Sequence, residues 1–148
     1  MRRIIKREDG GISVINPAPK SRREDETEVD WLAIVFAKAT PAGAEFIDVP
    51  ASGVPSDRTF REAWIYDGAI KVHMGKAKEI HKNRWREARK PLLENLDAEF
   101  MRALESDDKA KMAEIKAKKQ ALRDITKTDL SAVATPEALK QIWPEILK

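Results

Sequence analysis

The sequence contains no cysteine, and it has no long run of hydrophobic residues. Without cysteine the chain forms no disulfide, and thiolate catalysis and thiolate-based zinc sites are excluded. The longest apolar segment, from Trp31 to Ala37, is far shorter than the roughly 20 residues that a transmembrane helix needs. The basic N-terminus, MRRIIKRED, lacks the apolar region of a signal peptide. We therefore expect a soluble protein with no membrane partner.

Histidine is also scarce, with only His73 and His81 in the chain. On a helix these two residues would lie about 80° apart, without a third metal ligand in register. Surface or helix-capping roles are therefore expected for both. No Ser/His/Asp constellation suggests itself, and Gly10-Gly11 lacks the following helix of a phosphate-binding loop. We expect no metal, no cofactor and no catalytic residue, so the protein is predicted not to be an enzyme.

Charge is what the sequence has in abundance. Charged residues make up 36% of its 148 residues, but the two signs nearly cancel and leave a net charge of +3. So small an imbalance is weak evidence for a nucleic-acid partner. The length suits one medium domain or two small ones.

Residues 1–72 are predicted to form a small N-terminal portion with strands. Two β-compatible runs flank Asp9-Gly10, which predicts a hairpin over residues 3–15. Residues 28–38 fit either a helix capped by Thr27 or a buried strand, and we favour the helix.

A second hairpin is predicted over residues 63–72, because Asp67-Gly68 separates two β-rich runs. A two-residue turn there places Ile65 opposite Ile70. It also puts Trp64 and Tyr66 together on the other face, which then packs against a helix of this chain or against a partner.

Residues 73–148 are predicted to be helical. Apolar residues recur at helical spacing over about 74–105, and a second stripe over about 107–125 predicts an antiparallel helical hairpin. Pro91 is expected to kink the first helix. A proline after a capping threonine starts a last helix over 136–143. The predicted fold class is α+β: a small portion with β-hairpins, then a long helical hairpin and a short C-terminal helix.

The first half of the long helix is basic, whereas its second half is acidic and faces the basic second helix. The basic half suggests phosphate binding, but we favour a solvated or intramolecularly paired face because its charges are spread around the helix. This half-helix and the aromatic hairpin face supply the candidate partner-binding residues: Trp64, Tyr66, Lys82, Arg84, Trp85, Arg86, Arg89 and Lys90.

Several segments resemble a family of small, mostly uncharacterised proteins of tailed phages and prophages. These segments are DRTFREAW (57–64), VHMGKAKEI (72–80), WREAR (85–89), LENLD (93–97), KQALRD (119–124) and TPEALKQIWP (135–144). The family is similar, in its leucine-arginine-aspartate segment after a charged helix, to the C-terminal part of tail-fibre assembly chaperones. The sequence departs from the family pattern at His73, where the pattern has an acid.

The resemblance implies a non-enzymatic virion protein of the tail or tail-fibre attachment region, assembled in the host cytoplasm, with other tail or fibre proteins as partners. The long helix would be roughly 45 Å long, and its exposed apolar surface could be covered by copies of the chain. We therefore also expect a homo-oligomer. The alternatives are a transient tail-fibre assembly chaperone and a small nucleic-acid-binding regulatory protein.

Overall fold

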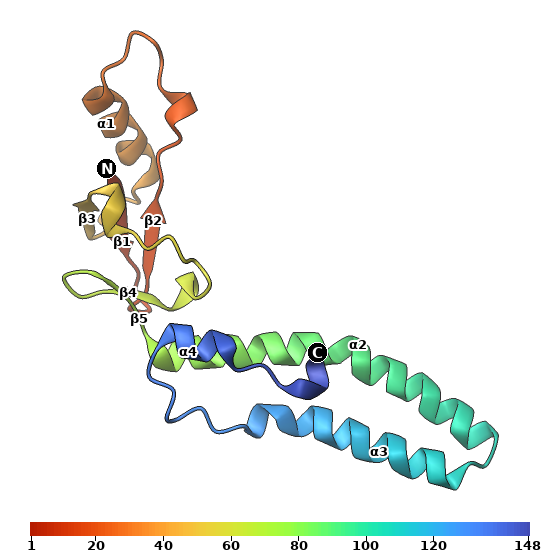
Figure 1. The fold of residues 1–148 in the computed structure, drawn as a ribbon. Helices are drawn as coiled ribbons and strands as arrows, with labels where there is room; N and C mark the ends of the chain where they lie inside the picture. The colour runs from red at the N-terminus through yellow and green to blue at the C-terminus, as the bar shows by residue number, and fades with distance from the viewer. The chain divides into compact units, whose positions relative to one another are not determined.

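The computed structural model describes all 148 residues, which form two compact units over residues 1–73 and 74–148. The first unit combines strands with one α-helix, and the second contains only helices (Figure 1). The predicted α+β fold class, with a long helical hairpin after a small portion with strands, is thereby confirmed. None of the helices is long and apolar enough to cross a bilayer.

A three-stranded antiparallel sheet with the order β2-β1-β3 forms the first unit's centre. The predicted first hairpin joins β1 (Arg2–Lys6) to β2 (Ile12–Ile15), and β3 (Phe46–Val49) pairs with the other edge of β1. Gly10 in the turn has a φ of +76°, a conformation that glycine adopts without steric cost.

The ambiguous segment after residue 27 is a helix, α1 (Glu28–Ala39). The hydroxyl oxygen of Thr27 accepts a hydrogen bond from the backbone N–H of Asp30 at 3.2 Å, so the predicted cap is present. Trp31 is buried, and its indole N–H donates to the Ser21 hydroxyl at 3.0 Å. The cap and the polar partner of Trp31 favour the helix over the strand alternative.

The second hairpin is present but its predicted register is wrong by one residue. Strands β4 (Trp64–Tyr66) and β5 (Ile70–Val72) pair Tyr66 with Ile70 and Trp64 with Val72. The connection therefore has three residues, with Gly68 at a φ of +70° and a hydrogen bond of 3.0 Å from Asp67 N–H to Ala69 O. This register places four apolar side chains on one face, where Trp64 packs with Ile4 and Ile12 of the sheet. Burial of that face explains the shift.

The long helix of the second unit, α2 (Met74–Glu105), has the predicted bounds and continues through Pro91. It bends in its middle and turns back into α3 (Lys109–Asp124), which runs antiparallel beside it (Figure 1). The Asp108 carboxylate caps α3 by accepting from the backbone N–H of Lys111 at 2.9 Å. Helix α3 begins and ends within two residues of its predicted bounds.

The last helix, α4 (Pro136–Gln141), starts at the predicted cap of Thr135 but ends two residues early. Ile142 is extended, with φ −85° and ψ 103°, and the residue before Pro144 is biased away from helix as well. Short 3-10 helices complete the chain: η1 (Pro19–Ser21), η2 (Ala51–Gly53), η3 (Arg61–Ala63), η4 (Ile125–Lys127) and η5 (Glu145–Leu147).

The core of the second unit lies where α2 meets α3, η4, α4 and η5. Its fully buried large side chains are Trp85, Ile115, Leu122 and Leu139. At the far end of α2 the buried residue is Ala103, while its neighbour Leu104 is 50% exposed. The apolar residues of α2 that are spaced four apart, up to Leu104, turn gradually away from α3. The reason is that an α-helix has 3.6 residues per turn, so a four-residue spacing shifts around the helix.

Candidate partner-binding surfaces

The aromatic hairpin face is not a free surface. Trp64 is 3% exposed and Tyr66 is half-buried, and both pack on the three-stranded sheet of the same unit. The one-residue register shift is the reason, since it groups these aromatics with Ile70 and Val72 on the covered face. The predicted partner-binding role of Trp64 therefore has to be corrected to a core role.

Trp85 is likewise internal, with 0% of its surface exposed. It lies beside His81, whose ring centroid is 5.2 Å away in an edge-on arrangement. The buried indole N–H of Trp85 has no hydrogen-bond acceptor. Its role is packing in the core of the second unit, and it does not form part of a surface.

His81 is the residue that the sequence interpretation misplaced most clearly. It was expected on the surface or at a cap, but it is 3% exposed. Its Nε2–H donates to the carbonyl oxygen of Ile142 at 2.7 Å, and its ring also meets that of Trp143 edge-on at 5.9 Å. Its position four residues before Trp85, on the same helix face, was the available signal.

Several cations in the basic first half of α2 form ion pairs or hydrogen bonds within the second unit. Arg86 pairs with Glu79 at 2.7 Å, and Lys90 pairs with Glu87 at 2.8 Å. Arg89 donates to the carbonyl oxygens of Leu122 and Arg123 at 3.2 and 3.0 Å. Lys82 and Arg84 are partly buried. The Lys82 charge contributes to lowering the pKa of Asp129, after hydrogen bonds from Ser131.

These contacts divide the eight predicted site residues into two groups. The structure buries both tryptophans, whereas Tyr66 and the five cations keep part of their surface exposed. The five cations lie on one stretch of α2. Three of them, Arg86, Arg89 and Lys90, bind groups of the same unit. Their binding to a partner stays a prediction.

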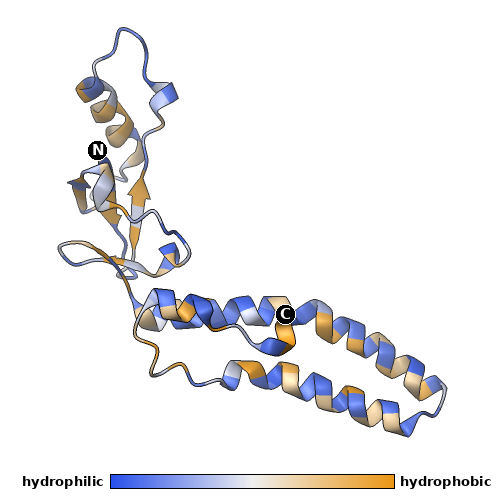
Figure 2. Cartoon of the chain, in the orientation of Figure 1, coloured by the Kyte–Doolittle hydropathy of each residue, from blue (hydrophilic) through white to orange (hydrophobic).

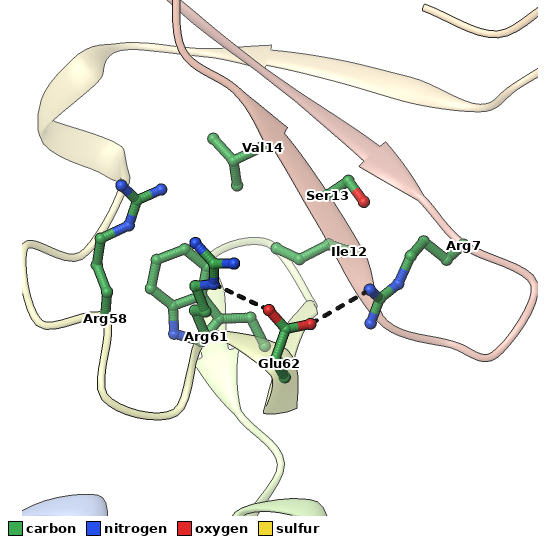
Figure 3. A pocket seen from close by; sticks show the side chains of 8 residues that line it. Arg7, Ile12, Ser13, Val14, Arg58, Arg61 and Glu62 are labelled. Atoms are coloured by element: carbon green, nitrogen blue, oxygen red, sulfur yellow. Dashed lines mark hydrogen bonds and ion pairs between the residues drawn. The ribbon is translucent and has the colours of Figure 1, made fainter.

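An arginine-lined pocket of about 200 Å³ lies in the first unit and was not foreseen (Figure 3). Arg7 and Arg58 flank it on opposite sides, with Arg61 and Glu62 between them. Glu62 accepts from Arg61 at 2.9 Å and lies 3.7 Å from Arg7. Ile12, Val14 and Trp64 contribute apolar side chains to its lining. The Glu62 carboxylate offsets part of the pocket's positive charge. The lining residues come from two separate segments of the sequence, so no local motif predicts the pocket.

The helical hairpin of the second unit carries apolar side chains that remain exposed. On α2, Met101 is 54% and Leu104 is 50% exposed, and on η5 Ile146 is 41% exposed. Figure 2 shows hydrophobic residues recurring along both α2 and α3 as far as their connecting turn. Exposed apolar side chains gathered on one element are typical of a protein-binding surface.

One apolar groove on this hairpin is formed by Leu92 and Leu96 of α2, Leu122 of α3 and Ile146 of η5. Its volume is about 400 Å³. No group of three or more His, Asp or Glu side chains is arranged to hold a metal ion. An apolar groove of this kind is suited to packing against another protein.

No protein-family model matches this chain, and no curated protein or solved structure is significantly similar to it. The functional interpretation therefore depends on the chain's own residues and geometry.

Proposed function

We propose that this chain is a non-enzymatic structural or adaptor protein of the tail or tail-fibre attachment region of a tailed-phage virion. Its helical hairpin makes the protein–protein contacts, with other tail or fibre proteins and with further copies of the chain. The observation that carries the proposal is the exposure of Met101 and Leu104 near the tip of a 32-residue helix. The resemblance of residues 57–144 to phage and prophage proteins supplies the biological setting.

The carboxyl groups whose pKa values are shifted are all held in the ionised form at neutral pH. Asp48, Asp67, Glu114 and Asp124 all have pKa values lowered by hydrogen bonds from neighbouring cations, and the pKa of Asp129 is lowered by Ser131. A general acid at neutral pH needs a shift in the opposite direction. These carboxylates are suited to holding surface charge and to forming ion pairs.

Mass spectrometry of purified virions tests the proposal directly. Particles from an induced lysate are banded and digested, and we expect peptides of this chain at a constant ratio to the tail proteins. Tails purified without heads should contain the same ratio. Absence of the chain from both particles contradicts the structural role.

The transient tail-fibre assembly chaperone is the second candidate, because exposed apolar surface also suits a factor that binds an unassembled fibre. It predicts that the chain co-purifies with fibre subunits before assembly and is missing from mature particles. The regulatory nucleic-acid-binding alternative is disfavoured by the ion pairs of Arg86 and Lys90. It predicts binding to duplex DNA that weakens steeply with salt, and an unchanged DNA mobility at low salt would remove it.

A further inference from the structure

The hairpin of α2 and α3 has two flanks, and only one carries further elements of its unit. Ile146 of η5 lies over the side where Leu92 and Leu96 of α2 meet Leu122 of α3. On the other side, Lys116 and Lys119 of α3 lie 5.7 Å from the ring centroid of Phe100. We call this second side the open flank.

The open flank is apolar along its centre. Leu93, Phe100 and Leu104 follow one another at spacings of seven and four residues, which places them on one face of α2, and Met101 lies at its edge. Leu104 and Met101 are half exposed, and Leu93 and Phe100 are partly buried. The helical hairpin therefore offers an apolar strip that is half exposed at Met101 and Leu104 and is partly covered at Phe100 by Lys116 and Lys119 of α3.

The two helices that border the open flank, α2 and α3, carry opposite charge. In the second half of α2 the acids Glu94, Asp97 and Glu105 lie outside the groove of the covered flank, whereas Glu99 lines that groove. Helix α3 has six bases against two acids, and of these bases only Lys118 lines the groove. The charges are only partly used within the hairpin: Asp97 pairs with Lys119, but Glu94 and Glu105 form no ion pair. Lys109 and Arg123 of α3 form none either.

We propose that the open flank binds the open flank of a second copy of this chain, forming a four-helix bundle with its two-fold axis parallel to the helices. With that axis, α2 of one copy lies on α3 of the other, antiparallel to it, and acids meet bases at both contacts. A two-fold axis across the helices would stack α2 on α2 and α3 on α3, acid on acid and base on base. Charge complementarity selects the first arrangement.

The inference rests on the proposed function, since it specifies how the hairpin's expected contact with a further copy is made. It also leaves a role for the other flank. The groove of Leu92, Leu96, Leu122 and Ile146 stays accessible in the dimer and is available to a tail or fibre protein.

The first test is the oligomeric state of the full chain, measured by sedimentation equilibrium up to about 100 μM, where even a weak specific dimer is populated. We expect a dimer. Leu104→Glu should weaken it roughly tenfold or more, because a charge then replaces the most exposed leucine of the apolar strip. Ile146→Glu is the matched control: it is similarly exposed but lies on the covered flank, and its dimer should be unchanged. Far-UV circular dichroism verifies that both variants are folded.

A charge exchange tests the pairing of α2 with α3. One double variant, Glu94→Lys with Glu105→Lys, makes the second half of α2 basic. The other, Lys109→Glu with Arg123→Glu, makes α3 more acidic. Each double variant alone should dimerise roughly tenfold or more weakly, and an equimolar mixture should recover a heterodimer. Both sets avoid residues with ion pairs, so the hairpin itself is preserved.

A monomeric wild type at the highest concentration, or an assembly other than a dimer, overturns the inference. So does a charge-exchanged pair whose members each dimerise like wild type. These outcomes are independent of the virion test: a monomer that is nevertheless found in purified tails removes the dimer and leaves the adaptor role intact.

Discussion

The Nε2–H of His81 donates a hydrogen bond of 2.7 Å to the backbone carbonyl oxygen of Ile142, and this bond fastens the segment after α4 to the long helix. Ile142 is the C-cap residue of α4, so its carbonyl has no partner within that helix. The imidazole sits between the rings of Trp85 and Trp143 and makes edge-on contact with both. A single polar side chain thus joins two elements that are more than 60 residues apart in sequence.

His81→Ala should lower the free energy of unfolding by about 2–4 kcal/mol, because it opens a cavity and leaves the Ile142 carbonyl without its donor. Urea unfolding followed by far-UV circular dichroism measures the loss in helix stability. Gln141→Ala, an exposed neighbour on α4, is the control and should change stability by less than about 0.5 kcal/mol. Equal midpoints for His81→Ala and wild type would contradict the structural role.

Arg89 is expected to stabilise the hairpin rather than to serve only as a partner contact. Its guanidinium donates to the carbonyl oxygens of Leu122 and Arg123, in the last turn of α3. Arg89→Ala should therefore cost about 1–2 kcal/mol, and Arg89→Lys should retain part of that stability. Lys90→Ala removes only an exposed ion pair and should cost at most about 0.5 kcal/mol. The prediction fails if Arg89→Ala and Lys90→Ala unfold at the same urea concentration.

The pair of Arg3 and Asp48 should make the first unit sensitive to acid. Arg3 donates from Nε and Nη2 to the two Asp48 oxygens, both at 2.7 Å, and these bonds hold the pKa of Asp48 below its ordinary value of 3.8. A lowered folded-state pKa means that the stabilisation is complete above pH 3.8 and is lost as the pH falls through the lowered value.

Asp48→Asn removes this titration. We expect wild type to be more stable than Asp48→Asn at pH 7 by about 0.5–1 kcal/mol, since the carboxylate is partly solvated, and the difference should shrink as the pH falls below 3.8. Thermal unfolding of both proteins across this pH range measures it. A difference that stays constant with pH would show that the carboxylate charge is not responsible.

Gly68 should tolerate asparagine better than alanine. Its φ of +70° strains an L-residue, although a Cβ there would meet no atom within 4 Å. Gly68→Ala should destabilise the first unit by about 1 kcal/mol, and Gly68→Asn by less, because asparagine adopts this conformation more readily. Thermal unfolding distinguishes the two variants. Gly53→Ala, without a positive φ, serves as the control and should be milder.

Local signals in the sequence were sufficient for most helix and turn positions. The threonine caps at Thr27 and Thr135 fixed the starts of α1 and α4, because capping depends on atoms only a few residues away. The end of α4 could not be placed as well, since the extension of Ile142 accompanies its contact with His81 across the fold.

The candidate site was predicted less well than the fold, for a physical reason. A sequence shows that Trp64 and Trp85 form apolar faces, but it does not show which element covers each face. The sheet covers Trp64, and the segment after α4 packs over the face of α2 that carries His81 and Trp85.

The sequence by itself determined the α+β class, the bounds of the long helix and the alternation of charge between the two helices of the hairpin. Periodicity, caps and composition are properties of neighbouring residues, so they can be identified without knowledge of the fold. The tertiary structure alone decided the register of β4 and β5, the burial of His81 and the presence of an open flank at Leu104. Each of these depends on which surfaces meet, because burial is a property of contacts between distant segments.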